Sequence, residues 1–215
     1  GFQPLVVDAV SQQTLRTRLG IPERFVLYTG GIDHRKNIEG LIRAFALLPE
    51  VDRAQLQLAV VCAISDEHRV RLGKLVRQSG LQPEAVVFTG FVPDDDLRAL
   101  YNLCELFVFP SWHEGFGLPA LEAMACGKAV IASNCTSLPE VLGRADALFD
   151  PHDDRAIADK MAQVLSDPDF RKTLERHGVE QAQKFSWDAC AQAALTAITA
   201  HRLQHTAAIN TVRAP

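Results

Sequence analysis

Short apolar runs rich in β-branched and aromatic residues alternate along the chain with stretches whose apolar residues recur every three or four positions. The first pattern is typical of buried strands, and the second of helices that lie on a sheet. The predicted strands are residues 25–29, 56–61, 85–88, 106–109, 129–132 and 147–149. The predicted helices are residues 11–19, 38–48, 66–79, 94–104, 119–126, 137–142, 157–165, 170–185 and 187–202. This alternation predicts an α/β fold class with a doubly wound parallel (Rossmann-like) sheet and extra C-terminal helices.

Local signals at the helix ends refine this outline. Asn37 and Asp94 precede two of the helical patterns and are residue types that cap helix N-termini, so both are predicted as caps. Residues 1–20 fit the alternation poorly, and we expect them to be an entry segment that arrives from a preceding domain. Residues 21–204 are then one domain, and residues 205–215 are a frayed tail.

Composition narrows the class of protein. The chain has 215 residues, 47% hydrophobic and 22% charged, which is typical of a globular domain. Its net charge of −4 argues against nucleic acid as a partner, because such proteins need concentrated positive charge. The five cysteines form no C-x-x-C pair, which favours a reducing location in the cytoplasm, either free or at the inner face of the membrane. No histidine pair has metal-ligand spacing, so we expect no metal site.

The first chemically distinctive loop follows the strand at 25–29. Gly30 and Gly31 let the backbone approach a ligand closely, and Arg35 and Lys36 follow just before a helix. The helix dipole disfavours cations at its N-terminus. An anion such as a diphosphate, bound by the cations and the helix N–H groups, would explain their position. The alternative is a solvated basic turn.

The second loop follows the strand at 106–109. Residues 115–120 read Gly-Phe-Gly-Leu-Pro-Ala and match the dinucleotide pattern G-x-G-x-x-A, but they follow the fourth strand rather than the first. Two acids, Glu114 and Glu122, stand seven residues apart across this turn. A carboxylate beside glycines can accept hydrogen bonds from sugar hydroxyls, so this loop predicts a site for a sugar or a ribose.

Together these motifs resemble a known family. Residues 114–122 are similar to the Glu–seven residues–Glu signature of the group 1 (family 4) retaining glycosyltransferases. Residues 30–37, residues 88–92, and Asn134 with residues 137–140 resemble the family's other signatures in the same order. The resemblance covers residues 25–187. It implies the C-terminal, donor-binding half of a two-domain GT-B fold and an enzyme of the hexosyltransferase type.

The resemblance also implies roles for individual residues. Arg35 and Lys36 would hold the donor diphosphate and offset the charge that develops on it as it departs. Glu114 would position the donor sugar, and Glu122 would accept hydrogen bonds from the ribose. The full set assigned to catalysis is Glu114, Arg35 and Lys36, and the set assigned to donor binding is Gly30, Gly31, Gly90, Phe91, Val92, Gly115, Phe116, Gly117, Leu118 and Glu122. No cofactor and no metal is implied.

Substrates and partners follow from the same resemblance. Residues 134–140 look more like mannosyl- than glucosyltransferase versions of that loop, which favours GDP-mannose over UDP- or ADP-sugars as the donor. The acceptor would be a glycan or a lipid-linked glycan in polysaccharide biosynthesis. Because the family's acceptor-binding N-terminal half is missing, we expect this chain alone to bind nucleotide sugar weakly and to transfer it negligibly.

Three other functions remain open at this point. A GT-B sugar-nucleotide 2-epimerase would share the fold and need no acceptor. A non-enzymatic nucleotide-sugar-binding module would bind the donor without reaction. An NAD-dependent oxidoreductase is the interpretation that the bare G-x-G-x-x-A pattern gives.

Overall fold

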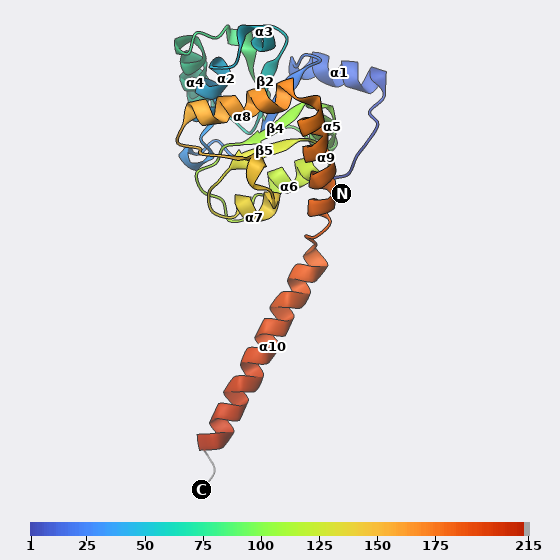
Figure 1. Cartoon of the computed structure of the whole chain (residues 1–215), viewed down its shortest axis with the longest axis vertical. Coiled ribbons are helices and arrows are strands. Elements are labelled where there is room, and N and C mark those ends of the chain that lie inside the picture. Colours follow the sequence, from blue (N-terminus) through green and yellow to red (C-terminus); the bar gives the residue numbers. More distant parts are fainter. Residues whose placement is uncertain (213–215) are drawn as a thin grey trace. The chain divides into compact units, whose positions relative to one another are not determined.

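The computed structural model describes the backbone of residues 1–212 and the side chains of residues 1–201. The chain forms two compact units, residues 1–182 and residues 183–215. A six-stranded sheet lies in the first unit (Figure 1). The second unit contains one helix, α10 (Trp187–Val212), whose described side chains are exposed. The tail expected at residues 205–215 lies outside the residues whose side chains are described.

The sheet is parallel and doubly wound, as predicted. Its strand order is β3-β2-β1-β4-β5-β6, and every neighbouring pair is parallel. Each predicted strand lies within one residue of the observed one. The observed strands are β1 (Phe25–Thr29), β2 (Gln57–Val61), β3 (Val86–Phe88), β4 (Leu106–Phe109), β5 (Val130–Ser133) and β6 (Leu148–Phe149).

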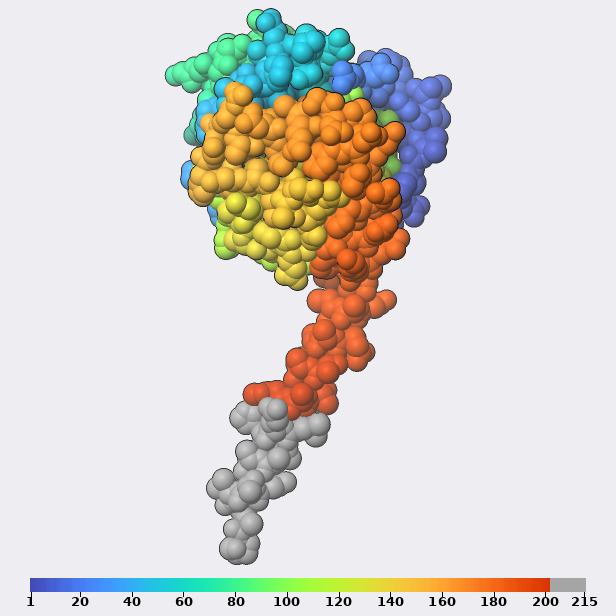
Figure 2. Space-filling model, viewed as in Figure 1, coloured from blue at the N-terminus to red at the C-terminus, as the bar shows by residue number. Residues whose placement is uncertain are grey.

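Helices cover both faces of the sheet, which explains why the strands are apolar along their whole length. The contacts between elements place α2, α4 and α8 on one face, and α5, α6, α7 and α9 on the other. Figure 2 shows the closed surface that α8 (orange) and its neighbours give the first unit. The helices of this unit are α1 (Ala9–Leu19), α2 (Ile38–Ala46), α3 (Glu50–Arg53), α4 (Asp66–Gln78), α5 (Asp94–Leu103), α6 (Leu118–Ala125), α7 (Leu138–Leu142), α8 (Asp154–Ser166) and α9 (Pro168–Ala182). The short helix α3 was not predicted.

Of the two predicted helix caps, Asn37 is confirmed in position only, and Asp94 is wrong by one residue. Asn37 occupies the N-cap position of α2, but its side chain makes no capping hydrogen bond and is buried instead. Pro93, not Asp94, is the N-cap of α5. Asp94 lies in the first helical turn, where its charge still complements the positive end of the helix dipole.

The first twenty residues are more ordered than the pattern predicted. Asp8 caps α1 by accepting the backbone N–H groups of Val10 and Ser11, and Leu15 buries its side chain in the core. An ion pair of 2.6 Å between Arg18 and Asp96 joins α1 to α5. These contacts fix the start of the chain on the edge of the sheet unit.

Candidate functional site

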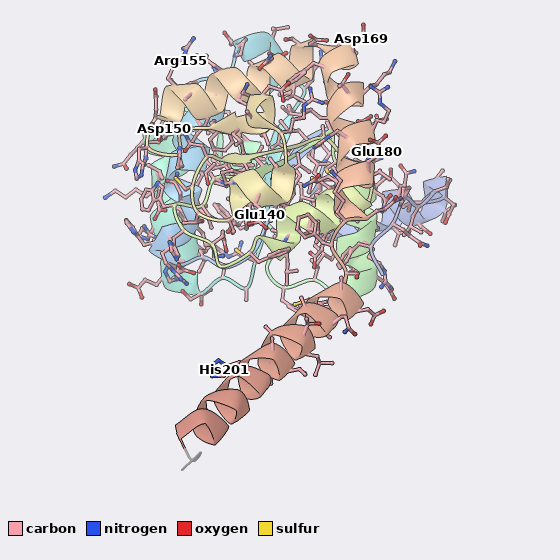
Figure 3. The ribbon with its side chains drawn as sticks, turned by 60° about the horizontal axis from the view of Figure 1, so that its bottom comes forward. Glu140, Asp150, Arg155, Asp169, Glu180 and His201 are labelled. Atoms are coloured by element: carbon pink, nitrogen blue, oxygen red, sulfur yellow. The ribbon has the colours of Figure 1, made fainter. Side chains whose placement is uncertain are left out.

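The candidate site lies where the strand order reverses. The chain runs outward from β1 through β2 to β3, and then returns to place β4 on the other side of β1. In open parallel sheets, ligands bind beyond the carboxyl ends of the strands at such a reversal. The loops that follow β1 and β4 carry the two motifs singled out in the sequence, so the fold brings them to one place. Figure 3 labels Glu140 in α7, the helix that follows β5, and Asp150, the residue that follows β6.

A charge pair joins these two loops. Lys36 Nζ, from the β1 loop, lies 2.7 Å from Glu114 Oε1, from the β4 loop. Their side chains are only 16% and 11% exposed. The ammonium group also lies 5.7 Å from the ring centroid of Phe109, the last residue of β4. The pair places one cation and one carboxylate, both largely shielded from water, at the point where the sheet order reverses.

Arg35 behaves differently from its neighbour. Its guanidinium Nε lies 2.8 Å from Asp33 Oδ1, within the same loop, and both side chains are largely exposed. This contact holds the pKa of Asp33 below its usual value. The structure therefore brings Lys36 to Glu114 and leaves Arg35 at the rim, where a bound anion could compete with Asp33.

Buried hydrogen bonds hold the loops in register. Asn37 Nδ2 donates to the carbonyl oxygens of Pro110, after β4, and Pro151, after β6, at 3.2 and 2.8 Å. The backbone N–H of Trp112 donates to the Arg35 carbonyl at 2.8 Å. Because Asn37 is buried, its two bonds are costly to lose, and all three bonds set the spacing between the loops.

The glycines of the β4 loop permit a close approach of chains. Gly117 has a φ of 107°, in the region that favours glycine, and a Cβ there would lie 2.6 Å from Leu138 Cδ2. Gly117 is the N-cap of α6. Pro119 has no N–H and the Ala120 N–H donates to the Gly117 carbonyl at 3.0 Å, so Leu118 supplies the N–H of this first turn that has no acceptor within the helix. Gly115, Phe116 and Leu118 in the same loop are exposed. This geometry suits binding of an anion or a sugar by main-chain groups.

The second acid of the motif belongs to a buried network. Tyr101 Oη donates to Glu122 Oε2 at 2.9 Å and lies 2.8 Å from Thr29 Oγ1. Burial raises the pKa of Glu122, the Tyr101 bond partly offsets this rise, and the Asp94 charge adds to it. The network joins the end of β1 to α6 through a tyrosine on α5. It holds a carboxylate that is poorly solvated and suited to accept hydroxyl donors.

The segment after β3 also lies at the carboxyl-terminal ends of the strands, two strands away from β1. Gly90 has a φ of 79°, Phe91 is 80% exposed and Val92 is buried. Arg69 of α4 donates a hydrogen bond of 3.0 Å to the Phe88 carbonyl and steadies the approach to this turn. Because β2 separates β3 from β1, this segment could contact only a ligand long enough to reach across β2.

The described residues contain neither a cluster of metal ligands nor a membrane-spanning helix. No three His, Cys, Asp or Glu side chains among them converge as metal ligands would. Within the same residues, no helix has both the length and the apolar character needed to span a membrane.

Comparison with known sequences identifies the family. The sequence profile of the family described as glycosyl transferases group 1 matches residues 11–181, which include every motif of the candidate site. The chain belongs to this family. Its Rossmann-like sheet is the one found in GT-B glycosyltransferases, and a solved C-terminal domain of the group 1 glycosyltransferase LpcC from Francisella tularensis has a TM-score of 0.70 at 26% identity. That match covers 85% of this chain and 94% of the LpcC domain.

Two curated relatives carry mannosyltransferase names. The chain is 46% identical over 201 residues to the serotype-specific mannosyltransferase WbdA of Escherichia coli, which covers 93% of this chain and 25% of that protein. It is 43% identical over 166 residues to the O-antigen chain mannosyltransferase B of Escherichia coli, which covers 77% and 43%. The chain therefore spans about a quarter of WbdA and less than half of the second relative.

Three residues of the candidate site have contacts that the sequence does not indicate. Tyr101 is simply one position of the predicted helix at 94–104. Asn37 is singled out as a helix cap and within residues 30–37, and Thr136 only as one of residues 134–140. The Thr136 hydroxyl accepts the Glu114 N–H at 3.0 Å. All three act through hydrogen bonds to residues distant in sequence, for which hydrophobic periodicity carries no signal.

Proposed function

We propose that this chain is the nucleotide-sugar donor-binding domain of a retaining mannosyltransferase that uses GDP-mannose and acts in the synthesis of a polysaccharide. The observation that carries the proposal is the shielded Lys36–Glu114 pair at the sheet reversal. The family match and the mannosyltransferase names of the relatives support the choice of reaction and sugar.

Lys36 and Arg35 bind the donor diphosphate in this proposal. Lys36 keeps its contact with Glu114 Oε1, and Arg35 exchanges Asp33 for a phosphate oxygen. As the bond between the anomeric carbon and the diphosphate breaks, negative charge grows on the departing group. Cations that are already in place stabilise that charge without reorganisation of solvent.

Glu114 and Glu122 hold the two sugars of the donor. The second oxygen of Glu114, Oε2, accepts a hydroxyl of the mannose, while the Gly115–Leu118 backbone encloses the same sugar. Glu122 accepts the ribose hydroxyls, because a carboxylate with little solvation gains most from new donors. The turn at Gly90–Val92 meets the base. Glu114 positions the sugar and forms no covalent intermediate.

The acceptor, a glycan or a lipid-linked glycan, binds on a further domain. The relatives are two to four times longer than the matched region, which leaves room for such a domain. Residues 1–20 enter from it, and residues 21–204 make up the donor domain. The enzyme works in the cytoplasm, at the inner face of the membrane where a lipid-linked acceptor would lie. The isolated chain binds donor weakly and transfers it negligibly.

Calorimetric titration with GDP, UDP, ADP and NADH tests the proposal. We expect GDP to bind, and the Lys36→Ala and Glu122→Ala variants each to lose about tenfold or more in affinity, as removal of a charge-assisted bond typically costs. Lys74→Ala and Glu84→Ala are the matched controls, because both residues are exposed and lie toward the opposite edge of the sheet. Binding of NADH alone, or equal affinity in all four variants, would contradict the proposal.

A further inference from the structure

The loop between β5 and α7 contains a strained residue. Thr136 has a φ of 51°, and Asn37 is the only other described residue besides glycine with a positive φ. A β-branched side chain rarely adopts this left-handed backbone conformation, whereas asparagine tolerates it. Such strain persists only where the surrounding contacts impose it, so the contacts of Thr136 indicate what maintains it.

Those contacts converge on the backbone of the β4 loop at Glu114. Thr136 Oγ1 accepts the N–H of Glu114 at 3.0 Å. The next hydroxyl, Ser137 Oγ, donates its single hydrogen mainly to the Phe116 carbonyl at 2.7 Å, with the Glu114 carbonyl further away at 3.3 Å. Two adjacent side chains thus anchor the backbone of residues 114–116. They do so from the loop of the neighbouring strand, β5, 22 and 23 residues away.

The base of the two loops is fixed separately. Ser133 Oγ, at the end of β5, donates to the Ser111 carbonyl at 2.5 Å, and both residues are fully buried. The strands below are paired in register, with Phe109 opposite Ala132. The hydroxyls of Thr136 and Ser137 are therefore not needed to bring the loops together. Their specific effect is on where the β4 loop places Glu114.

We propose that Thr136 is a positioning residue for Glu114, which it aims at the donor sugar. Lys36 binds one carboxylate oxygen of Glu114, and Thr136 binds the backbone N–H of the same residue. Glu114 is therefore held both at the tip of its side chain and at its backbone. The strained backbone is what points the Thr136 hydroxyl at that N–H. This inference rests on the proposed function, since it assigns Glu114 to the sugar rather than to the nucleotide.

The test separates the sugar from the nucleotide by calorimetry on the same chain. Dissociation constants are measured for GDP and GDP-mannose, and for UDP with UDP-glucose and ADP with ADP-glucose. Within each pair, the dissociation constant of the nucleoside diphosphate divided by that of the nucleotide sugar gives the factor by which the sugar strengthens binding. Three variants are compared with the natural chain: Thr136→Ser keeps the hydroxyl, Thr136→Val keeps the branched shape without it, and Thr136→Gly removes both hydroxyl and strain.

We expect Thr136→Val and Thr136→Gly to reduce the ratio about five- to tenfold, which is in the upper part of the range for losing one neutral hydrogen bond, while Thr136→Ser retains it. Affinity for the nucleoside diphosphate should change by less than about twofold. Melting temperatures complete the comparison. Glycine relieves the strain and valine does not, so equal loss of the ratio in both variants shows that the effect follows the hydroxyl and not the stability of the fold.

The outcomes distinguish the inference from the function beneath it. If the natural chain binds a nucleoside diphosphate and Thr136→Val leaves the ratio unchanged, including a ratio of one, the inference is overturned and the proposed function stands. If Thr136→Ser loses as much as Thr136→Val, the hydroxyl is not the cause and the inference is again overturned. If the natural chain binds none of the six probes, both the function and the inference fail.

Discussion

Removal of the Tyr101 hydroxyl tests the buried network most cleanly. Tyr101 is fully buried, and its Oη lies between Thr29 Oγ1 at 2.8 Å and Glu122 Oε2 at 2.9 Å. Phenylalanine would keep the ring contacts with Phe2 and Phe107, whose centroids each lie 5.5 Å away. The Tyr101→Phe variant therefore loses the two hydrogen bonds and little packing.

The size of the effect follows from those two bonds. A bond to an ionised carboxylate contributes about 1.5–3 kcal/mol and one to a neutral hydroxyl about 0.5–1.5 kcal/mol. Glu122 is partly exposed, so water replaces some of the first bond. We expect a net loss of about 1–3 kcal/mol in the free energy of unfolding. In a unit of this size, residues 1–182, that loss lowers the melting temperature by about 3–10 °C.

The loss should also depend on pH. Burial raises the folded-state pKa of Glu122 above its unfolded value, and the Tyr101 bond opposes that rise, so the variant raises the pKa further. The bond to Tyr101 is strongest when Glu122 is ionised. The destabilisation is therefore full above the folded pKa of Glu122 and shrinks as pH falls through it and the carboxyl takes up its proton.

Thermal unfolding followed by circular dichroism, at neutral pH and at successively lower pH values, measures both effects. Tyr28→Phe is the matched control, because Tyr28 is equally buried and donates to a neutral acceptor, the Gly31 carbonyl, at 2.7 Å. The fall in melting temperature of the Tyr28→Phe variant should not change with pH. A melting temperature for Tyr101→Phe within about 1 °C of the natural chain, or a fall as independent of pH as the control's, would show that the Tyr101 hydroxyl does not stabilise the ionised Glu122.

Three further predictions concern single positions. Glu122→Gln should raise the melting temperature at neutral pH and lower nucleotide affinity, because it removes an ionised carboxylate that burial disfavours. The gain in melting temperature should vanish as pH is lowered and the natural Glu122 is protonated, and a lower melting temperature at neutral pH would contradict this prediction. Gly117→Ala should cost about 2–4 kcal/mol in urea denaturation, from backbone strain at a φ of 107° and the clash with Leu138, and an unchanged midpoint would show that the loop relaxes freely. Asn37→Ala should cost about 2–4 kcal/mol in the same assay, since two buried loop carbonyls lose their donor, and a cost below about 0.5 kcal/mol would show that water takes its place.

The parts of the fold that are predictable from sequence are those set by local pattern. A strand covered on both faces needs an apolar side chain at nearly every position, and β1 and β4 are fully buried along their length. The short helix α3 (Glu50–Arg53) has no buried residue, so no hydrophobic periodicity marks it. Asn37 is different, because its residue type predicts a cap, yet the carbonyls to which its side chain donates lie 73 and 114 residues away.

The position of the candidate site is likewise predictable from sequence, whereas its individual contacts are not. The strand-to-helix alternation and the rule for open sheets locate the β1 and β4 loops at one edge, so the neighbourhood of Lys36 and Glu114 is predictable. Their direct pairing is not, since Arg35, an equal candidate in the sequence, bonds to Asp33 instead. The hydroxyls of Tyr101 and Thr136 act across different elements. Only the folded chain shows which of its many hydroxyls reach the two glutamates.

A crystal structure of the chain with bound GDP would show whether the loops after β1 and β4 hold a nucleoside diphosphate. We expect the diphosphate within hydrogen-bond distance of Lys36 Nζ and the ribose hydroxyls on the Glu122 carboxylate. A nucleotide bound elsewhere, or one between these loops with its ribose away from Glu122, would contradict the proposed site.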